Sequence, residues 1–95
     1  MLRHVLLVRL KPGVTAEQAG AFAEAITAVS FPGRHNVIVA RDLGVRPGNM
    51  DLVVSNDFPD QAAYEAWGQY PDHVRVREQF LAPIAERVER CLFPV

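Results

Sequence analysis

The stretch LRHVLLVRL (residues 2–10) decides the architecture of the chain. Side chains alternate between the two faces of a strand. His4, Leu6 and Val8 therefore share one face, and the other face carries the apolar Val5 and Leu7 beside Arg9. A strand that is apolar on both faces predicts a sheet that is covered on both sides.

A helix is expected directly after this strand, over residues 16–29. Thr15 is a good N-cap, and Gln18 three residues later completes a capping box. Apolar side chains then recur at helical spacing, at Ala19, Phe22, Ala23, Ile26 and Val29. The segment Phe31-Pro32-Gly33 ends the helix.

The rest of the chain adds three strands and two helices. The strands are expected at residues 34–43, 50–58 and 86–93. Asp60 caps a helix that runs to about Gln69, and another helix begins at Pro71 and ends near Pro83. The order β-α-β-β-α-β predicts a single α+β domain with the ferredoxin-like fold, a four-stranded antiparallel sheet with helices on one face.

The helix-free face of this sheet is expected to be apolar and to need a cover. The simplest cover is a second copy of the chain, related by a two-fold axis. We expect a homodimer formed through this face, with Val39 among the residues on it. The alternative is a monomer that tolerates a mixed face.

Composition excludes several classes of protein. The 10 basic and 11 acidic residues give a net charge of −1 and form no basic stripe, which argues against nucleic-acid binding. The opening apolar run is too short for a membrane span or a signal peptide, so a cytoplasmic protein is expected. The single Cys91 excludes an internal disulfide and a cysteine zinc site, and we expect it to be a small buried residue.

An aromatic corner is the strongest candidate for chemistry. Tyr64, Trp67 and Tyr70 are three residues apart and are expected to stack along one helix face. His73 falls in the first turn of the helix that begins at Pro71, where the helix dipole disfavours the imidazolium. A neutral ring that exchanges a proton near pH 7 is one interpretation, and a packed helix corner with a surface histidine is the other.

Four segments together resemble the stress-responsive dimeric α/β-barrel (Dabb) family. They are RHVLLVRLKPGV (residues 3–14), RDL (41–43), DLVV (51–54) and YPDH (70–73). The resemblance extends over essentially the whole chain. It implies a homodimer in which the two sheets close into a barrel.

The resemblance also implies candidate chemistry, because a plant member of this family performs cofactor-free aldol cyclisation of a polyketide. By position, its catalytic histidine corresponds to His73 and its strand histidine to His4. Its catalytic tyrosine corresponds to Trp67, which has only an indole N–H to donate. The nearest phenol at the corner is Tyr70, displaced by three residues.

These observations leave three functions open. The first is binding of a small hydrophobic or aromatic molecule in an apolar cavity, without metal or cofactor. The second is cofactor-free cyclase or aldol-type proton transfer, with His73 as general base and Tyr70 or His4 as proton donor. The third is a haem or quinol-type monooxygenase using Asn56, Trp67 and His73, which a haemin-induced Soret shift would reveal.

A cavity between the helices and the sheet is common to all three functions. His4 and His73 are expected to line the same cavity within one protomer. We expect its walls to be formed by Phe22, Ile26, Val54, Trp67 and Phe80. His35 lies in a polar run and is expected to be in solvent.

Overall fold

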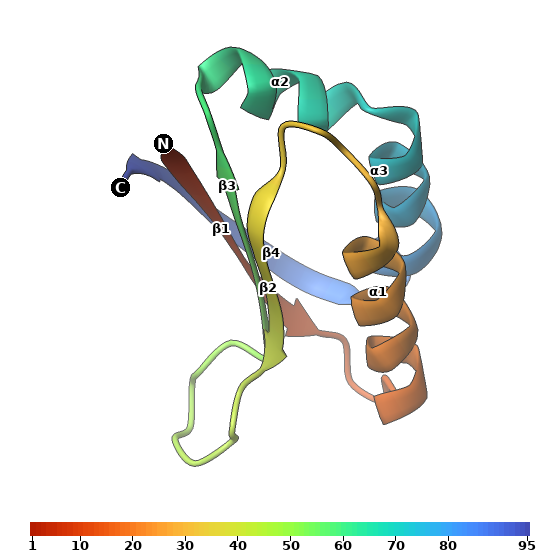
Figure 1. Cartoon of the computed structure of the whole chain (residues 1–95). Coiled ribbons are helices and arrows are strands. Elements are labelled where there is room, and N and C mark those ends of the chain that lie inside the picture. Colours follow the sequence, from red (N-terminus) through yellow and green to blue (C-terminus); the bar gives the residue numbers. More distant parts are fainter.

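The computed structural model describes all 95 residues and has the predicted order of elements, with all helices on one side of the sheet (Figure 1). The sheet is antiparallel, with strand order β2-β3-β1-β4. The predicted ferredoxin-like α+β fold is therefore confirmed. The elements are β1 (Leu2–Leu10), α1 (Ala16–Ala28), β2 (His35–Arg41), β3 (Leu52–Phe58), α2 (Gln61–Gln69), α3 (Pro71–Val76), the π-helix η1 (Arg77–Leu81) and β4 (Ala85–Pro94).

Both predicted helix caps are present. The Gln18 backbone N–H donates to Thr15 Oγ1 at 3.1 Å, and the Thr15 N–H donates to Gln18 Oε1 at 2.9 Å. Asp60 Oδ1 accepts from the backbone N–H of Ala63 at 2.9 Å at the start of α2. These bonds satisfy N–H groups that have no partner inside the helix, and so determine where α1 and α2 begin.

The segment after Pro71 differs from the single helix that was expected. It divides into α3 and η1, and the Ala82 N–H donates to Arg77 O, a carbonyl five residues earlier. Pro83 has no N–H to continue the hydrogen-bond series, so the helical segment ends here. The strands also differ at their ends: β2 and β3 are shorter than expected, and β4 is longer.

The hydrophobic core lies between the helices and the sheet. In β1, the face with His4 and Val8 is directed toward the helices, and both side chains are buried. Phe22 of α1, Phe58 of β3 and Trp67 of α2 belong to the same layer. No helix is long and apolar enough to cross a membrane.

The expected position of Val39 on the helix-free face is wrong. Val39 pairs with Val54, which belongs to the core, and Val39 itself packs against that core beside α1. Partners in an antiparallel sheet share a face, so Ile38 lies on the helix-free side instead. Alternation alone did not distinguish the two faces, because residues 37–40 are all apolar.

Cys91 is exposed, which corrects the expectation that it is buried. It lies on the edge strand β4 and pairs with Val5, whose side chain is on the helix-free side of β1. No helix covers that side. Leu7 is 37 % exposed there and Ile38 is 52 % exposed.

Candidate functional site

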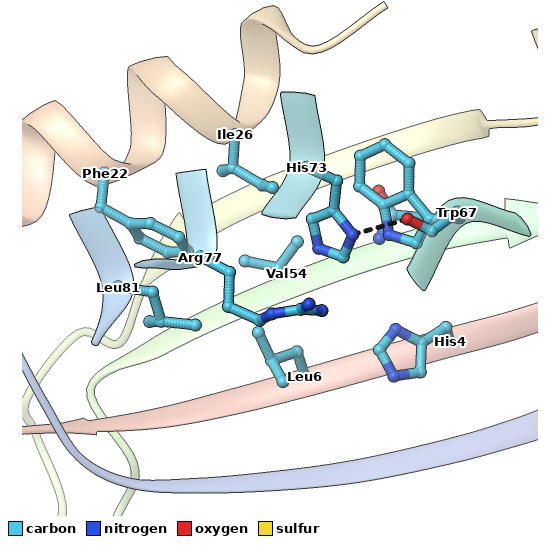
Figure 2. Close-up of a pocket in the computed structure, with 10 residues that line it drawn as sticks. His4, Leu6, Phe22, Ile26, Val54, Trp67, His73, Arg77 and Leu81 are labelled. Carbon is cyan, nitrogen blue, oxygen red and sulfur yellow. Dashed lines mark hydrogen bonds between the residues drawn. The ribbon is translucent and has the colours of Figure 1, made fainter. Parts of the chain in front are cut away.

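A cavity of about 30 Å³ lies between the sheet and the helices (Figure 2). It adjoins a larger recess of about 140 Å³ beside β4. The two hollows share His4, Leu6, Trp67, His73, Arg77 and Leu81. The inner cavity also borders Phe22, Ile26, Val54 and Asn56, and the outer recess borders Tyr64, Glu65, Gly68 and Arg90.

His73 reaches the cavity from α3, and its ring is held on two sides. Its Nδ1 lies 2.8 Å from Trp67 O, the hydrogen bond dashed in Figure 2. The ring also stacks on the indole of Trp67, with centroids 4.0 Å apart and planes 11° from parallel. A carbonyl only accepts, so Nδ1 carries the proton in the neutral ring and Nε2 keeps a free lone pair.

The protonation of His73 is governed by its surroundings. Burial lowers the pKa of His73, the hydrogen bond to Trp67 O partly opposes this, and the positive charges of Arg77 and Arg34 lower it further. The ring is therefore neutral at pH 7, and Nε2 is available as a proton acceptor.

His4 enters the same cavity from β1, on the opposite side (Figure 2). The residue is only 8 % exposed, yet neither Nδ1 nor Nε2 has a hydrogen-bond partner in the protein. Its ring packs against the ring of Tyr64, with the two ring centroids 4.9 Å apart. Burial lowers the pKa of His4, and the charge of Arg90 lowers it further. Buried polar groups without partners are rare in native proteins, so this ring is a candidate for contact with a ligand.

Arg34 is a structural part of the site that the sequence reasoning missed. It is 9 % exposed, and its Nε donates to Asn56 Oδ1 at 2.7 Å. Nη1 donates to two carbonyls at the C-terminal end of α1, that of Ile26 at 2.7 Å and that of the C-cap residue Val29 at 3.1 Å. The guanidinium carbon lies 4.6 Å from the Trp67 ring centroid, and burial lowers the pKa of Arg34 to about 10. Arg34 therefore connects α1, β3 and the aromatic wall of the cavity.

Most of the predicted site residues meet in the cavity. His4 and His73 line it together within one protomer, as expected, and Trp67 is part of the wall. The predicted wall residues Phe22, Ile26 and Val54 also border it. Their positions agree with the expectation, while the chemical roles remain predictions.

Tyr70 and Phe80 do not line the cavity. Tyr70 follows the last residue of α2 with an extended backbone, so it leaves the helical face that carries Trp67. Its ring packs edge-on against the ring of Phe31 instead, with the two ring centroids 5.0 Å apart. Phe80 packs against the hydrophobic core from η1. The phenol that borders the recess is Tyr64.

Leu6 and Arg77 also line the cavity and were not identified as site residues from the sequence, although the sequence carries a signal for each. Arg77 follows His73 by four residues, which places both on the same helical face. Leu6 shares a strand face with His4. The chain has no cluster of three or more His, Cys, Asp or Glu residues arranged to hold a metal ion.

His35 is exposed, as expected. Asn56 borders the cavity together with Trp67 and His73. Its side-chain oxygen is already engaged by Arg34. The three residues named for a monooxygenase therefore meet at the cavity, where the Asn56 side chain is held by Arg34.

Solved structures show the same fold. A dimeric ferredoxin-like protein of unknown function from Thermobifida fusca has 26 % identity and a TM-score of 0.91, over 99 % of this chain and 90 % of that one. A Dabb family protein from Mesorhizobium loti has 21 % identity and a TM-score of 0.79, over 99 % and 95 %. Hydroxynitrile lyase from Passiflora edulis has 17 % identity and a TM-score of 0.79, over 99 % and 92 %.

No protein of curated function matches the chain significantly. The family model for the stress responsive A/B barrel domain, Dabb, matches residues 2–91. Because that match covers nearly all of the 95 residues, the chain belongs to the Dabb family.

Proposed function

We propose that this chain is a homodimer and that each subunit binds a small hydrophobic or aromatic molecule in the recess that adjoins the cavity between helices and sheet. The observation that carries the ligand proposal is the buried ring of His4, whose two nitrogens have no protein partner beside apolar cavity walls. A ligand that brings a polar group to this ring satisfies it, while the walls bury the apolar part of the ligand.

The dimer proposal rests on the helix-free face of the sheet. Leu7 and Ile38 are exposed there, next to Val5 and Val53. Burying about 600 Å² of apolar surface would contribute about 15 kcal/mol before the costs of association. The structural relative from Thermobifida fusca is described as dimeric, which supports the same arrangement.

Ile38→Asp tests the interface. A carboxylate buried without a partner should dissociate the dimer, so sedimentation equilibrium should give a mass near 10.6 kDa, that of one chain. Ala62→Asp adds the same charge on the exposed surface of α2 and should leave the dimer intact. A wild-type mass of one chain, or an Ile38→Asp variant that remains dimeric at micromolar concentration, would contradict this interface.

Benzyl alcohol is a suitable first probe for the cavity. NMR should show shifts at the indole N–H of Trp67, the only tryptophan of the chain, and at the rings of His4 and His73. The exposed His35 is an internal control and should not respond. Shifts confined to surface residues, with none at Trp67 or the two cavity histidines, would refute binding in this cavity.

Proton transfer is the second candidate function, and the tautomer of His73 favours it. Nδ1–H is engaged by Trp67 O, so Nε2 is the basic atom. In this reaction Nε2 of His73 removes a proton from the carbon next to a ligand carbonyl. The His4 ring, which has no partner in the protein, donates a hydrogen bond to the enolate oxygen that forms. Deuterium exchange at the α-carbon of 1-phenyl-2-propanone should be accelerated by the wild type and lost in His73→Gln, whereas His35→Gln should retain it. Equal rates in the wild type and His73→Gln would remove this candidate.

A further inference from the structure

The outer recess has an unbalanced positive charge. Arg77 from η1 and Arg90 from β4 border it, and neither forms an ion pair. Glu65 from α2 is the only carboxylate that borders the recess, and the inner cavity has none. Arg34 adds a further buried charge behind Trp67. Cationic groups from η1, from β4 and from the loop before β2 therefore lie around the apolar walls.

We propose that the ligand is a small apolar acid, whose carboxylate or equivalent oxyanion binds between Arg77 and Arg90 while its ring packs on the cavity walls. This inference rests on the proposed binding function and adds the charge of the ligand. Guanidinium groups bind carboxylates through paired N–H donors. An anion also compensates a cluster of cations that the protein leaves unpaired.

Both arginines keep free N–H donors for a bound carboxylate. Arg77 forms a single side-chain hydrogen bond, from Nη1 to Gly68 O at 3.3 Å, and Arg90 forms none. Arg90 pairs with Leu6 in the register between β4 and β1, two residues from His4 on the same face. Figure 2 shows the Arg77 side chain extending from the helix layer into the space above Leu6 and beside His4. The two arginines thus approach the mouth of the hollow from opposite layers.

The dimensions limit the apolar part of the ligand. The recess measures about 140 Å³. A cavity of about 150 Å³ accommodates benzene. A single ring therefore fits against Leu6, Trp67 and Leu81, and its acidic group remains at the arginines.

The buried histidines provide a sensor for the ligand's charge. His4 faces Tyr64 and Glu65 from α2, Arg90 from β4, and Arg77 with His73 from the helix layer. The arginines favour the neutral form of both rings, and burial acts in the same direction. An anion bound between Arg77 and Arg90 compensates that positive field, so the pKa values of His4 and His73 should rise when it binds.

Benzoate, benzamide and benzylammonium form a matched set of probes, because they share a ring and differ in charge. Titration followed by the NMR signals of Trp67 and the cavity histidines should show benzoate binding roughly tenfold more tightly than benzamide, with benzylammonium weakest. Only benzoate should raise the pKa values of the two histidines. Equal affinity for benzoate and benzamide refutes the anion proposal while the cavity remains a binding site. Absence of any response to all three probes refutes the cavity function as well.

Arginine variants locate the contact. Arg90→Met removes a charge without breaking any hydrogen bond in the protein and should abolish most of the preference for benzoate over benzamide. Arg77→Met should also abolish most of this preference. The circular dichroism spectra of both variants should match that of the wild type, which shows that they are folded. Arg75→Met removes an equal charge from the exposed side of α3 and should keep the full preference. Retention of the preference in both Arg77→Met and Arg90→Met would overturn the proposed contact.

Discussion

Replacing His4 with leucine should stabilise the protein and impair its binding site at the same time. The His4 ring is buried and has no hydrogen-bond partner in the chain. Such groups cost free energy in the folded state and are retained where function needs them. Leucine has a similar volume and no polar atom, so it removes the cost without leaving a large void.

The magnitude follows from the ring's two nitrogens. A neutral imidazole has one donor and one acceptor, and each costs about 1–3 kcal/mol when it is buried unpaired. The adjoining cavity of about 30 Å³ has room for one water molecule, which would satisfy one of the two nitrogens and reduce the cost. His4→Leu should therefore raise the free energy of unfolding by about 1–2 kcal/mol. For a chain of this size that corresponds to roughly 5–10 °C in Tm.

Urea and thermal unfolding at one fixed protein concentration measure this effect, because the stability of the proposed dimer would depend on concentration. His35→Leu is the matched control and should change the free energy of unfolding by less than about 0.5 kcal/mol, since His35 is exposed. Benzoate binding to His4→Leu should be weaker than to the wild type, although the variant is more stable.

The same variant changes the dependence of stability on pH. Burial lowers the pKa values of His4 and His73 below 6.5 in the folded state, so the unfolded chain binds more protons below that pH. Stability is therefore complete above pH 6.5 and falls as the solution is acidified through that value. His4→Leu should make this decline shallower. A variant that is less stable than the wild type by 1 kcal/mol or more, with an unchanged pH slope, would show that His4 is a satisfied structural residue.

Three further outcomes are expected. Hydrogen bonds from Arg3 and Asn36 lower the pKa of Asp57 from 3.8 to about 2, so the stabilisation present above pH 3.8 is lost on acidification through that range. Asp57→Asn should therefore flatten the loss of stability between about pH 4 and pH 2, which urea titrations at several pH values measure. Arg34→Met should lower the free energy of unfolding by about 3 kcal/mol in urea titrations, because three buried acceptors lose their donor, and Arg34→Lys should recover only part of it. Phe22→Ala should cost about 3–5 kcal/mol in the same assay, and calorimetry should show that the enlarged cavity admits a two-ring neutral ligand.

The order of elements and the face that carries His4 follow from the sequence alone. Both depend on local chemistry: the alternation of side chains in residues 2–10, the capping pair Thr15 and Gln18, and the proline at position 71. Such signals extend over a few residues, and no distant partner is needed to interpret them. The placement of His4 and His73 in one cavity followed from this element order.

Only the tertiary structure decided which face of β2 covers the core, which tyrosine borders the recess and where Arg34 lies. Val39 faces the helices because it pairs with Val54, a choice that the uniformly apolar residues 37–40 left open. Tyr70 packs on Phe31 because the backbone leaves the helical path after α2. Arg34 is buried because carbonyls of α1 and the side chain of Asn56, 22 residues away, converge on it. Each of these outcomes depends on partners that only the folded chain brings together.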